Sequence, residues 1–273
     1  YRKRKREEGP LKEGKPELAI PRAEKKQEHD LVTCFGGFKI FDHSGLDMIA
    51  NLTPMQKEVL AYIAYHTFKE NKETGVAINR LDIALWHDTP PENLKNTRNA
   101  TFSKIRAALK EFEGISLNVQ NNSVIFQIGD KYLNEIETYF LLKRYLADET
   151  KLNDVEAVNN FIRLVSRGRF MGALSEEWVV NCRSREENEI LRILLPYLKK
   201  TYSEGKLEKC VEIADAVSIH EPLNEELLGI KLRSLYNLGR HSIALEIFNS
   251  HCKEYEAIFG ETCRTTLNDL LKG

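Results

Sequence analysis

The order of the predicted elements in the first half of the chain is the feature that most constrains its fold. Residues rich in β-formers come first, at 31–42, and three segments with helical periodicity follow. Two more β-forming segments, 115–120 and 123–128, are joined by an Asn-Asn pair, which predicts a tight hairpin because asparagine tolerates positive φ. Strand, helix, short helix, long helix and hairpin in this order predict a winged helix-turn-helix domain at 31–129.

The three helical segments carry start and stop signals. The sequence TPMQ at 53–56 is a capping box with proline at the first helical position, and it predicts a helix over 54–70. Asn79 is the expected N-cap of a short helix that ends near Trp86. TPPE at 89–92 is a second predicted capping box, and the long helix begins there.

The long helix has one apolar face and one basic face. Side chains at helical spacing predict a core-facing stripe: Leu94, Thr101, Ile105, Ala108, Leu109 and Phe112. The other faces carry five basic residues against one acid, Glu111, and are interleaved with amide and hydroxyl groups that can bond base edges or phosphate oxygens. A basic face alone is common on surface helices, but its place before a hairpin predicts DNA contact. The predicted DNA-binding residues are Lys95, Arg98, Asn99, Thr101, Ser103, Lys104, Arg106, Asn121 and Asn122.

Composition bounds the class of protein. The 273 residues are 42% hydrophobic and 30% charged, which suits a soluble chain of about two domains. Because the net charge is -1, any basic surface must be local. Five scattered cysteines without a CxxC pair predict buried thiols in the reducing cytoplasm rather than a disulfide framework or a zinc site.

The first 30 residues form a charged segment with two interpretations. Tyr1 is followed by RKRKR, a pattern typical of the cytoplasmic end of a transmembrane helix and equally of a flexible basic tail. From Glu7 to Asp30 the chain is charged and contains three prolines, which predicts a linker. Residues 1–30 are therefore expected to be a juxtamembrane or linker segment, and a membrane tether before Tyr1 would place the protein at the inner face of the cell membrane.

From Lys131 onward the sequence predicts helices almost without interruption and no strands. Three segments align, GRFMGAL from Gly168, GKLEKCV from Gly205 and GRHSIAL from Gly239, at intervals of 37 and 34 residues. A period of 34 is typical of the tetratricopeptide repeat, in which the glycine makes the turn between paired helices. We therefore expect an all-α tetratricopeptide-like domain at 130–273, with an unrelated helical bundle as the alternative.

Four segments between residues 32 and 129 resemble the response-regulator-type winged helix of SARP-type bacterial transcriptional regulators: FGGFKIFDHSG, LTPMQKEVLAYI, LDIALWHDTPP and SKIRAAL. The resemblance implies that Leu85 and Trp86 pack in the scaffold and that the Asn-Asn turn is the tip of the wing. It also implies that three residues approach DNA: Ser103, Lys104 and Arg106. The turn lacks the Arg or Lys that often reaches the minor groove, so backbone contact to phosphate is expected there rather than base contact.

The C-terminal segment HEPLNEELLGIKLRSLYNLGRHSIALEIFNSHCKEYEAIFG resembles the end of the bacterial transcriptional activator domain, which follows the winged helix in SARP-type regulators. Together the two resemblances imply a DNA-binding transcriptional regulator that binds double-stranded DNA. They also imply that the helical module serves self-association or contact with the transcription machinery, without a cofactor. The alternative is a protein-interaction adaptor whose winged helix is a docking surface that binds no DNA.

The sequence lacks the usual patterns of enzymes. Its seven histidines form no HExxH motif and no ligand cluster with cysteine, and no nucleophile motif is present. His241 and His251 are expected to be ordinary surface or interface histidines. The acidic stretch SREENE at 184–189 is expected to be a solvated helix face. We therefore expect neither catalytic nor metal-binding residues.

Overall fold

The computed structural model describes residues 30–70, 74–110 and 112–272, and it is mostly helical with two small sheets. In the first sheet, β1 (Asp30–Thr33) pairs antiparallel with β2 (Lys39–Phe41) and parallel with β6 (Tyr132–Asn134). The β-forming segment at 31–42 is thus two short strands. The expectation of no strand after Lys131 is wrong, because the second edge of β1 has backbone groups that need partners and β6 supplies them.

Three helices follow in the predicted order: α1 (Pro54–Lys69), α2 (Ile78–Leu85) and α3 (Pro91–Leu109). The Thr53 capping box is confirmed, with reciprocal bonds between Thr53 and Gln56. The Asn79 cap is wrong, because β3 (Val76–Ala77) runs directly into α2 and leaves Ala77 as the N-cap.

The second predicted capping box is also wrong. Pro90 is the N-cap of α3 and Pro91 the first helical residue, so Thr89 lies one position outside the cap. No side-chain hydrogen bond caps the helix. Two consecutive prolines begin α3 instead, and their restricted φ suits the entry to a helix.

The hairpin after α3 is confirmed. It consists of β4 (Ile115–Gln120) and β5 (Ser123–Ile128), paired antiparallel, with φ of 47° at Asn121 and 58° at Asn122. Strand β5 lies between β3 and β4, so β4 is an edge strand of this sheet. The free edge of β4 lies beside α3.

The second half contains a short 3-10 turn (Glu149–Asn153) and seven helices among the described residues: α4 (Glu135–Leu146), α5 (Val155–Val165), α6 (Glu177–Ser203), α7 (Leu207–Ser218), α8 (Glu225–Asn237), α9 (His241–Phe259) and α10 (Leu267–Lys272). Gly205 lies in the turn between α6 and α7, and Gly239 in the turn between α8 and α9, with φ of 72° and 75°. These positive φ values are ones that glycine adopts without strain. Two of the three aligned segments therefore mark turns between successive helices.

The remaining aligned segment, which starts at Gly168, is not a helical repeat. Residues 168–174 form a turn before α6, in which Phe170 bridges to Phe35. Gly168 has φ of 136°, and a Cβ there would lie 2.8 Å from the Cα of Gly36. Glycine is required at position 168 because the two backbones approach so closely. The match of this segment to the repeat pattern therefore has a different cause, and the prediction of a repeat there is wrong.

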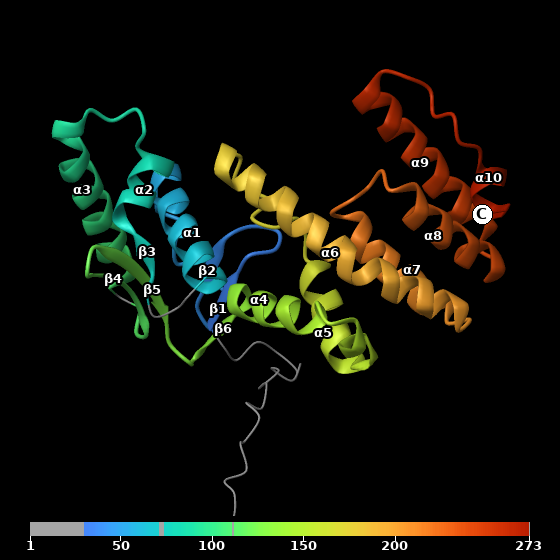
Figure 1. Ribbon diagram of the computed structural model, residues 1–273, viewed down its shortest axis with the longest axis horizontal. Helices are drawn as coiled ribbons and strands as arrows, with labels where there is room; N and C mark the ends of the chain where they lie inside the picture. The colour runs from blue at the N-terminus through green and yellow to red at the C-terminus, as the bar shows by residue number, and fades with distance from the viewer. Residues whose placement is uncertain (1–29, 71–73, 111, 273) are drawn as a thin grey trace, which may run out of the picture.

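The molecule is elongated. Figure 1 shows α3 and the β4–β5 hairpin at one end, α8, α9 and α10 at the other, and α6 across the middle. One continuous buried cluster extends from β1 through α1 and α4 to α7 and the start of α8, and a smaller one lies between α8 and α9. The first sheet, α4 and α6 therefore join the two ends through a common core.

Candidate nucleic-acid interface

Helix α3 rests on a buried aromatic support. Leu85 and Trp86, at the end of α2, are buried as the resemblance implied, and the Trp86 ring meets Phe102 of α3 edge-on with 6.4 Å between ring centroids. Ile105 and Leu109 are buried on the same side. Phe102 was absent from the predicted stripe although its spacing from Ile105 and Leu109 fits. The opposite side of α3 lies at the end of the molecule (Figure 1).

The outward side of α3 has a central stripe of small residues. Asn96, Ala100, Ser103 and Ala107 are all exposed and follow one another at spacings of four, three and four, which places them on one face of the helix. Small side chains there let the helix backbone approach another surface closely.

Three lysines flank this stripe: Lys95, Lys104 and Lys110. All three are exposed, and no ion pair joins any of them to another residue in the described part of the chain. Glu111, the acid predicted beside them, lies outside the described residues. Among the described residues, the three lysines therefore give this surface positive charges that no ion pair neutralises, which favours an anionic partner.

Arg98 is placed differently from these lysines. Its guanidinium is paired with Asp82 of α2, and only 12% of the Arg98 side chain and 14% of the Asp82 side chain are exposed. Arg98 follows Leu94 by four residues and precedes Ile105 by seven, so it lies on the core-facing side of α3. This ion pair ties the two helices together and sets the angle at which α3 is presented.

Arg106 joins α3 to the hairpin. Its Nε donates to the backbone carbonyl oxygen of Leu117 in β4 at 2.8 Å, and its guanidinium lies over the Phe102 ring, 5.8 Å from the centroid. Because β4 is an edge strand, this carbonyl has no strand partner on that side. Arg106 thus supplies the missing hydrogen bond and holds the hairpin against the helix.

A groove of about 360 Å³ runs between α3 and β4. Two cations, Arg106 and Lys110, lie on its helical side, and Ser116 and Asn118 lie on its strand side. Asn118 donates to Gln127 at 2.7 Å, which orients its amide. Lys110 was counted on the basic face but not among the predicted DNA-binding residues. Ser116 and Asn118 were missed by the sequence prediction, although polar side chains at alternate positions of β4 were a usable signal.

The remaining predicted residues are spread over the same end of the molecule. Asn99 is exposed on α3, whereas Thr101 is half-buried and its hydroxyl donates to the carbonyl of Thr97. Asn121 and Asn122 are exposed at the tip of the hairpin. The structure therefore brings most of the predicted set to one surface, with Arg98 and Thr101 turned toward the protein.

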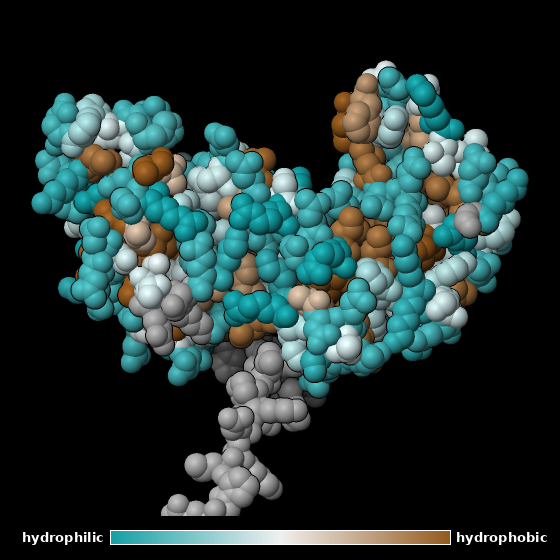
Figure 2. Space-filling view, in the orientation of Figure 1, coloured by the Kyte–Doolittle hydropathy of each residue, from teal (hydrophilic) through white to brown (hydrophobic). Residues whose placement is uncertain are grey.

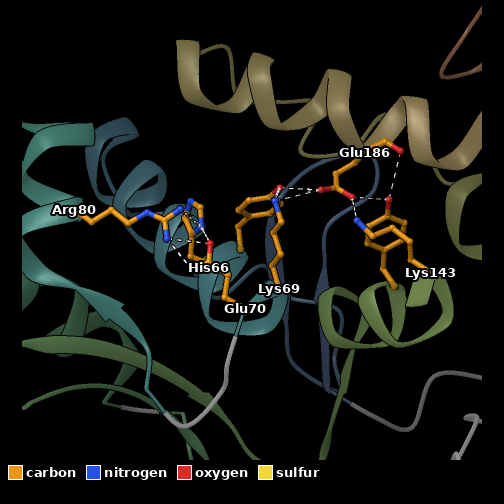
Figure 3. A network of polar contacts seen from close by, with 8 residues as sticks. His66, Lys69, Glu70, Arg80, Lys143 and Glu186 are labelled. Atoms are coloured by element: carbon orange, nitrogen blue, oxygen red, sulfur yellow. Dashed lines mark hydrogen bonds and ion pairs between the residues drawn. The ribbon is translucent and has the colours of Figure 1, made fainter. Parts of the chain in front are cut away.

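The helix that supports α2 carries a buried histidine. His66 of α1 lies beside Glu70, 3.0 Å from its carboxylate, and beside Arg80 of α2, and Arg80 bonds both carboxylate oxygens of Glu70 (Figure 3). Burial, and then the neighbouring Arg80 charge, lower the pKa of His66 from its ordinary 6.5 to about 4. His66 is thus neutral near pH 7, and the group fastens α2 to α1.

A second polar group joins this end to the helical half. Glu186 of α6 is fully buried and accepts hydrogen bonds from Tyr65 of α1 at 2.8 Å and from Tyr139 of α4 at 3.0 Å (Figure 3). Lys143 of α4 pairs with the same carboxylate, and the Lys69 ammonium lies 4.0 Å away. Burial, and then the Glu186 charge, raise the pKa of Tyr65, which keeps its hydroxyl a donor.

The expectation that 184–189 is a solvated face is therefore wrong for two residues. Glu187 is also buried, and Arg169 bonds both of its carboxylate oxygens, at 2.7 and 2.8 Å. The reason is tertiary, because the partners of the two carboxylates lie on other elements. Those of Glu186 are on α1 and α4, and that of Glu187 is Arg169 in the turn before α6.

The thiols and histidines form no visible metal site. In the ranges that the structure describes, no group of three or more His, Cys, Asp or Glu residues has the geometry to hold a metal ion. Cys34, Cys182 and Cys210 are buried as expected, and Cys252 and Cys263 are half-buried. His251 is buried rather than exposed, with Nδ1 3.3 Å from the carbonyl oxygen of Pro222.

No helix in the described residues combines the length and the apolar character needed to cross a membrane.

Comparison with known proteins identifies the helical half. Residues 164–268 match the family model of the bacterial transcriptional activator domain. No curated protein matches the chain. Among solved structures, the chain is similar to Mycobacterium tuberculosis EmbR in complex with a low affinity phosphopeptide, with a TM-score of 0.55 and 18% identity. The similarity covers 89% of this chain and 64% of that one, so the chain spans less than two thirds of that structure, and at this identity the likeness establishes the fold.

The family match runs from the end of α5 to the start of α10 and includes most of the C-terminal segment on which the sequence resemblance rested. The resemblance to SARP-type regulators is thereby confirmed. Their family is one of transcriptional regulators and not a class of enzymes. Residues 164–268 are thus similar to the activator domain that bacterial transcriptional regulators of this type carry.

Proposed function

We propose that the chain is a sequence-specific DNA-binding transcriptional regulator in which α1, α2, α3 and the β4–β5 hairpin act as a winged helix-turn-helix. The observation that carries the proposal is the outward face of α3, where exposed small residues are flanked by three lysines without ion-pair partners in the described residues. A helix with this surface can enter the major groove while its lysines reach the phosphates on both sides.

In this mechanism the predicted residues divide into two roles. Lys95, Lys104 and Lys110 neutralise phosphates, and Asn99 and Ser103 read base edges in the major groove. The groove between α3 and β4 would take a phosphate of the same backbone, with Ser116 and Asn118 as donors. Arg98 and Arg106 act indirectly, because their contacts hold α3 in position against α2 and the hairpin. Thr101 bonds the backbone of α3 itself and is assigned no direct DNA contact.

The test is a mobility-shift titration of the whole chain with pooled promoter fragments at low and moderate salt. We expect binding that weakens steeply as salt rises, and Lys104→Ala should weaken it for all sequences to a similar degree. Asn99→Ala should instead relax the preference among duplexes selected from a random pool.

The matched control for Lys104→Ala is Lys253→Ala, at an exposed lysine of α9 near the other end of the molecule. It should bind DNA as the wild type does. Absence of binding by the wild type at low salt, or equal effects of the two substitutions, would favour the alternative function of a protein-interaction adaptor.

We further propose that the helical half acts as a tetratricopeptide-like module for self-association. Supporting this, the last two turns of α9 carry exposed apolar side chains, Ile258 and Phe259, which are 57% and 58% exposed. Figure 2 shows hydrophobic residues along this part of α9. Sedimentation of the wild type and of Phe259→Glu tests the proposal; a monomeric wild type would point to the transcription machinery as partner instead.

We propose the boundary between the DNA-binding and activator domains at residues 129–130, with the N-terminal linker before residue 31. The family match begins later, at residue 164, and β6 lies just beyond the boundary while pairing with β1. Limited proteolysis followed by mass spectrometry tests it. Cleavage near residue 130 would support the boundary, and cleavage first near residues 166–176 would move it.

The membrane tether concerns residues 1–29, which lie outside the described part of the chain. It stays a prediction, as does a cytoplasmic location at the inner face of the membrane. Fractionation of cells that express the full-length protein, followed by a high-salt and alkaline wash, distinguishes a tether from a basic tail, because only a tethered protein resists both washes.

A further inference from the structure

A cavity unrelated to α3 lies between α4 and α5. It has a volume of about 80 Å³ and is open to the surface on one side. Leu133 and Leu164 form apolar walls, and Thr138 adds a third side. Its polar groups are Glu135 at the start of α4, Asn160 and Arg163 of α5, and Arg167 just after that helix.

The inner part of the cavity holds a donor and an acceptor without partners. Glu135 is buried, and Arg167 pairs with its Oε1, whereas its Oε2 has no hydrogen-bond partner among the described residues. The amide nitrogen of Asn160 is likewise enclosed and is not bonded to any described group. Thr138 does not donate to the Glu135 carboxylate, because its hydroxyl donates to the backbone carbonyl of Asn134.

A cavity lined by such groups is energetically unfavourable unless a ligand or water occupies it. A buried polar group without a partner destabilises the fold, and more so when it is charged. Here one carboxylate oxygen needs a donor and one amide nitrogen needs an acceptor, and both belong to residues that line the same cavity. At the mouth, Arg163 is exposed and forms no ion pair with a described residue, so it offers a cation to whatever enters.

The chemistry of the lining defines the ligand. It must present a donor, best a cationic one, to Glu135, and an anionic acceptor to Asn160 and Arg163. It must also be small, because about 80 Å³ corresponds to roughly three water molecules at liquid density. An ammonium group and a carboxylate a few bonds apart satisfy both conditions.

We propose that this cavity binds a small α-amino acid, whose ammonium group donates to Oε2 of Glu135 and whose carboxylate accepts from Asn160 and Arg163. The two leucine walls accept a side chain no larger than a methyl or hydroxymethyl group. The site is independent of the DNA-binding proposal, since none of its residues belongs to α3 or to the hairpin.

The test is calorimetric titration of the whole chain with glycine, L-alanine and L-serine, alongside methylammonium, acetate and L-tryptophan. We expect saturable binding of at least one of the three small amino acids. Methylammonium and acetate, each with half of the required groups, should bind at least about tenfold more weakly, as should L-tryptophan, which is too large.

Two variants and a control locate the site. Arg163→Gln changes an exposed side chain and should weaken amino-acid binding about tenfold or more without affecting folding. Asn160→Leu should abolish it, and Arg144→Gln, at an exposed arginine of α4 outside the cavity, should leave it unchanged. No saturable binding by any of the three amino acids, or equal binding by wild type and Arg163→Gln, would overturn the proposal and leave a cavity that holds only water.

Discussion

Helices α3 and α6 both carry runs of charged residues, yet the two runs have opposite surroundings. On α6, Glu186 and Glu187 are buried and each bonds partners on other elements. On α3, Lys95, Lys104 and Lys110 are exposed and have no ion-pair partner among the described residues. The difference arises because other elements cover these carboxylates, α1 and α4 at Glu186 and the 168–174 turn at Glu187, while only one side of α3 is covered.

The comparison separates charges that stabilise this protein from charges that are available to a partner. A buried carboxylate is tolerated only while its partners are present, so removing it leaves those partners unsatisfied. An exposed lysine contributes little to the free energy of unfolding, since water solvates it equally well in the unfolded chain. Four substitution experiments test this separation, in order of their expected effect on stability.

The largest effect is expected from Glu186→Ala. It removes the shared acceptor of Tyr65 and Tyr139 and leaves the Lys143 ammonium without its buried partner. We expect the free energy of unfolding to fall by about 3–5 kcal/mol in urea denaturation. Glu189→Ala on the same helix, at a half-exposed residue paired only with Arg192, should cost about 1 kcal/mol or less. An equally small loss of unfolding free energy for Glu186→Ala would contradict the view that the buried carboxylate stabilises the fold.

Arg98→Ala comes next, because Arg98 is the one α3 cation here that resembles the charges of α6. Its half-buried pair with Asp82 should contribute about 2 kcal/mol. A double-mutant cycle with Asp82→Ala measures the coupling between the two side chains directly. The control is Lys95→Ala, one turn earlier, which should change stability by no more than about 0.5 kcal/mol. A coupling energy near zero would mean that the Arg98–Asp82 pair does not stabilise the fold and that Arg98 behaves like the exposed lysines.

The third experiment uses pH. The folded pKa of His66, about 4, lies below its unfolded value of 6.5, so below pH 6.5 the unfolded chain binds a proton that the folded chain does not. Its contribution to stability is complete above pH 6.5 and is lost as pH falls toward 4. Between pH 6.5 and 5 this loss amounts to about 2 kcal/mol.

Urea denaturation of wild type and His66→Gln across that range measures the effect. The variant should lose less stability on acidification than the wild type does. His87→Gln, at an exposed histidine, should follow the wild-type curve. If His66→Gln also follows that curve, His66 is not held neutral by its surroundings.

The smallest effect on stability is expected from the combined change of Lys95, Lys104 and Lys110 to Ala. The free energy of unfolding should stay within about 0.5 kcal/mol, because surface changes of this kind are nearly neutral. DNA binding should respond strongly, with the slope of log affinity against log salt reduced by about three. A loss of stability without a change in this slope would mean that the three lysines stabilise the fold and do not contact DNA.

Features with local causes were predicted correctly from the sequence. The Thr53–Gln56 capping box and the Asn121–Asn122 turn are confirmed, since each depends on residues within four positions of one another. The predicted N-caps at Asn79 and Thr89 were wrong, although their sequence patterns fit an N-cap as well as the Thr53 pattern does. In the first case β3 runs directly into α2, and in the second two prolines start α3, so neighbouring structure overrode the local signal.

The candidate site shows the same division between local and tertiary causes. Spacing along α3 was enough to identify Lys95, Asn99, Ser103 and Lys104 as outward-facing. It did not reveal that Arg98 bonds Asp82 or that Arg106 bonds the edge of β4, because both partners lie on other elements. Ser116 and Asn118 entered the site only when the hairpin was placed beside the helix.

The sequence by itself determined the order of the three helices and the hairpin in the first half, the tight turn of that hairpin and the resemblance to the activator domain. Only the tertiary structure decided which charges are free. Whether a carboxylate or a guanidinium is solvated depends on what covers it, and for Glu186 the covering groups are more than 40 residues away. Helical periodicity tells which side chains share a face, but burial of that face requires a neighbour that the sequence does not name.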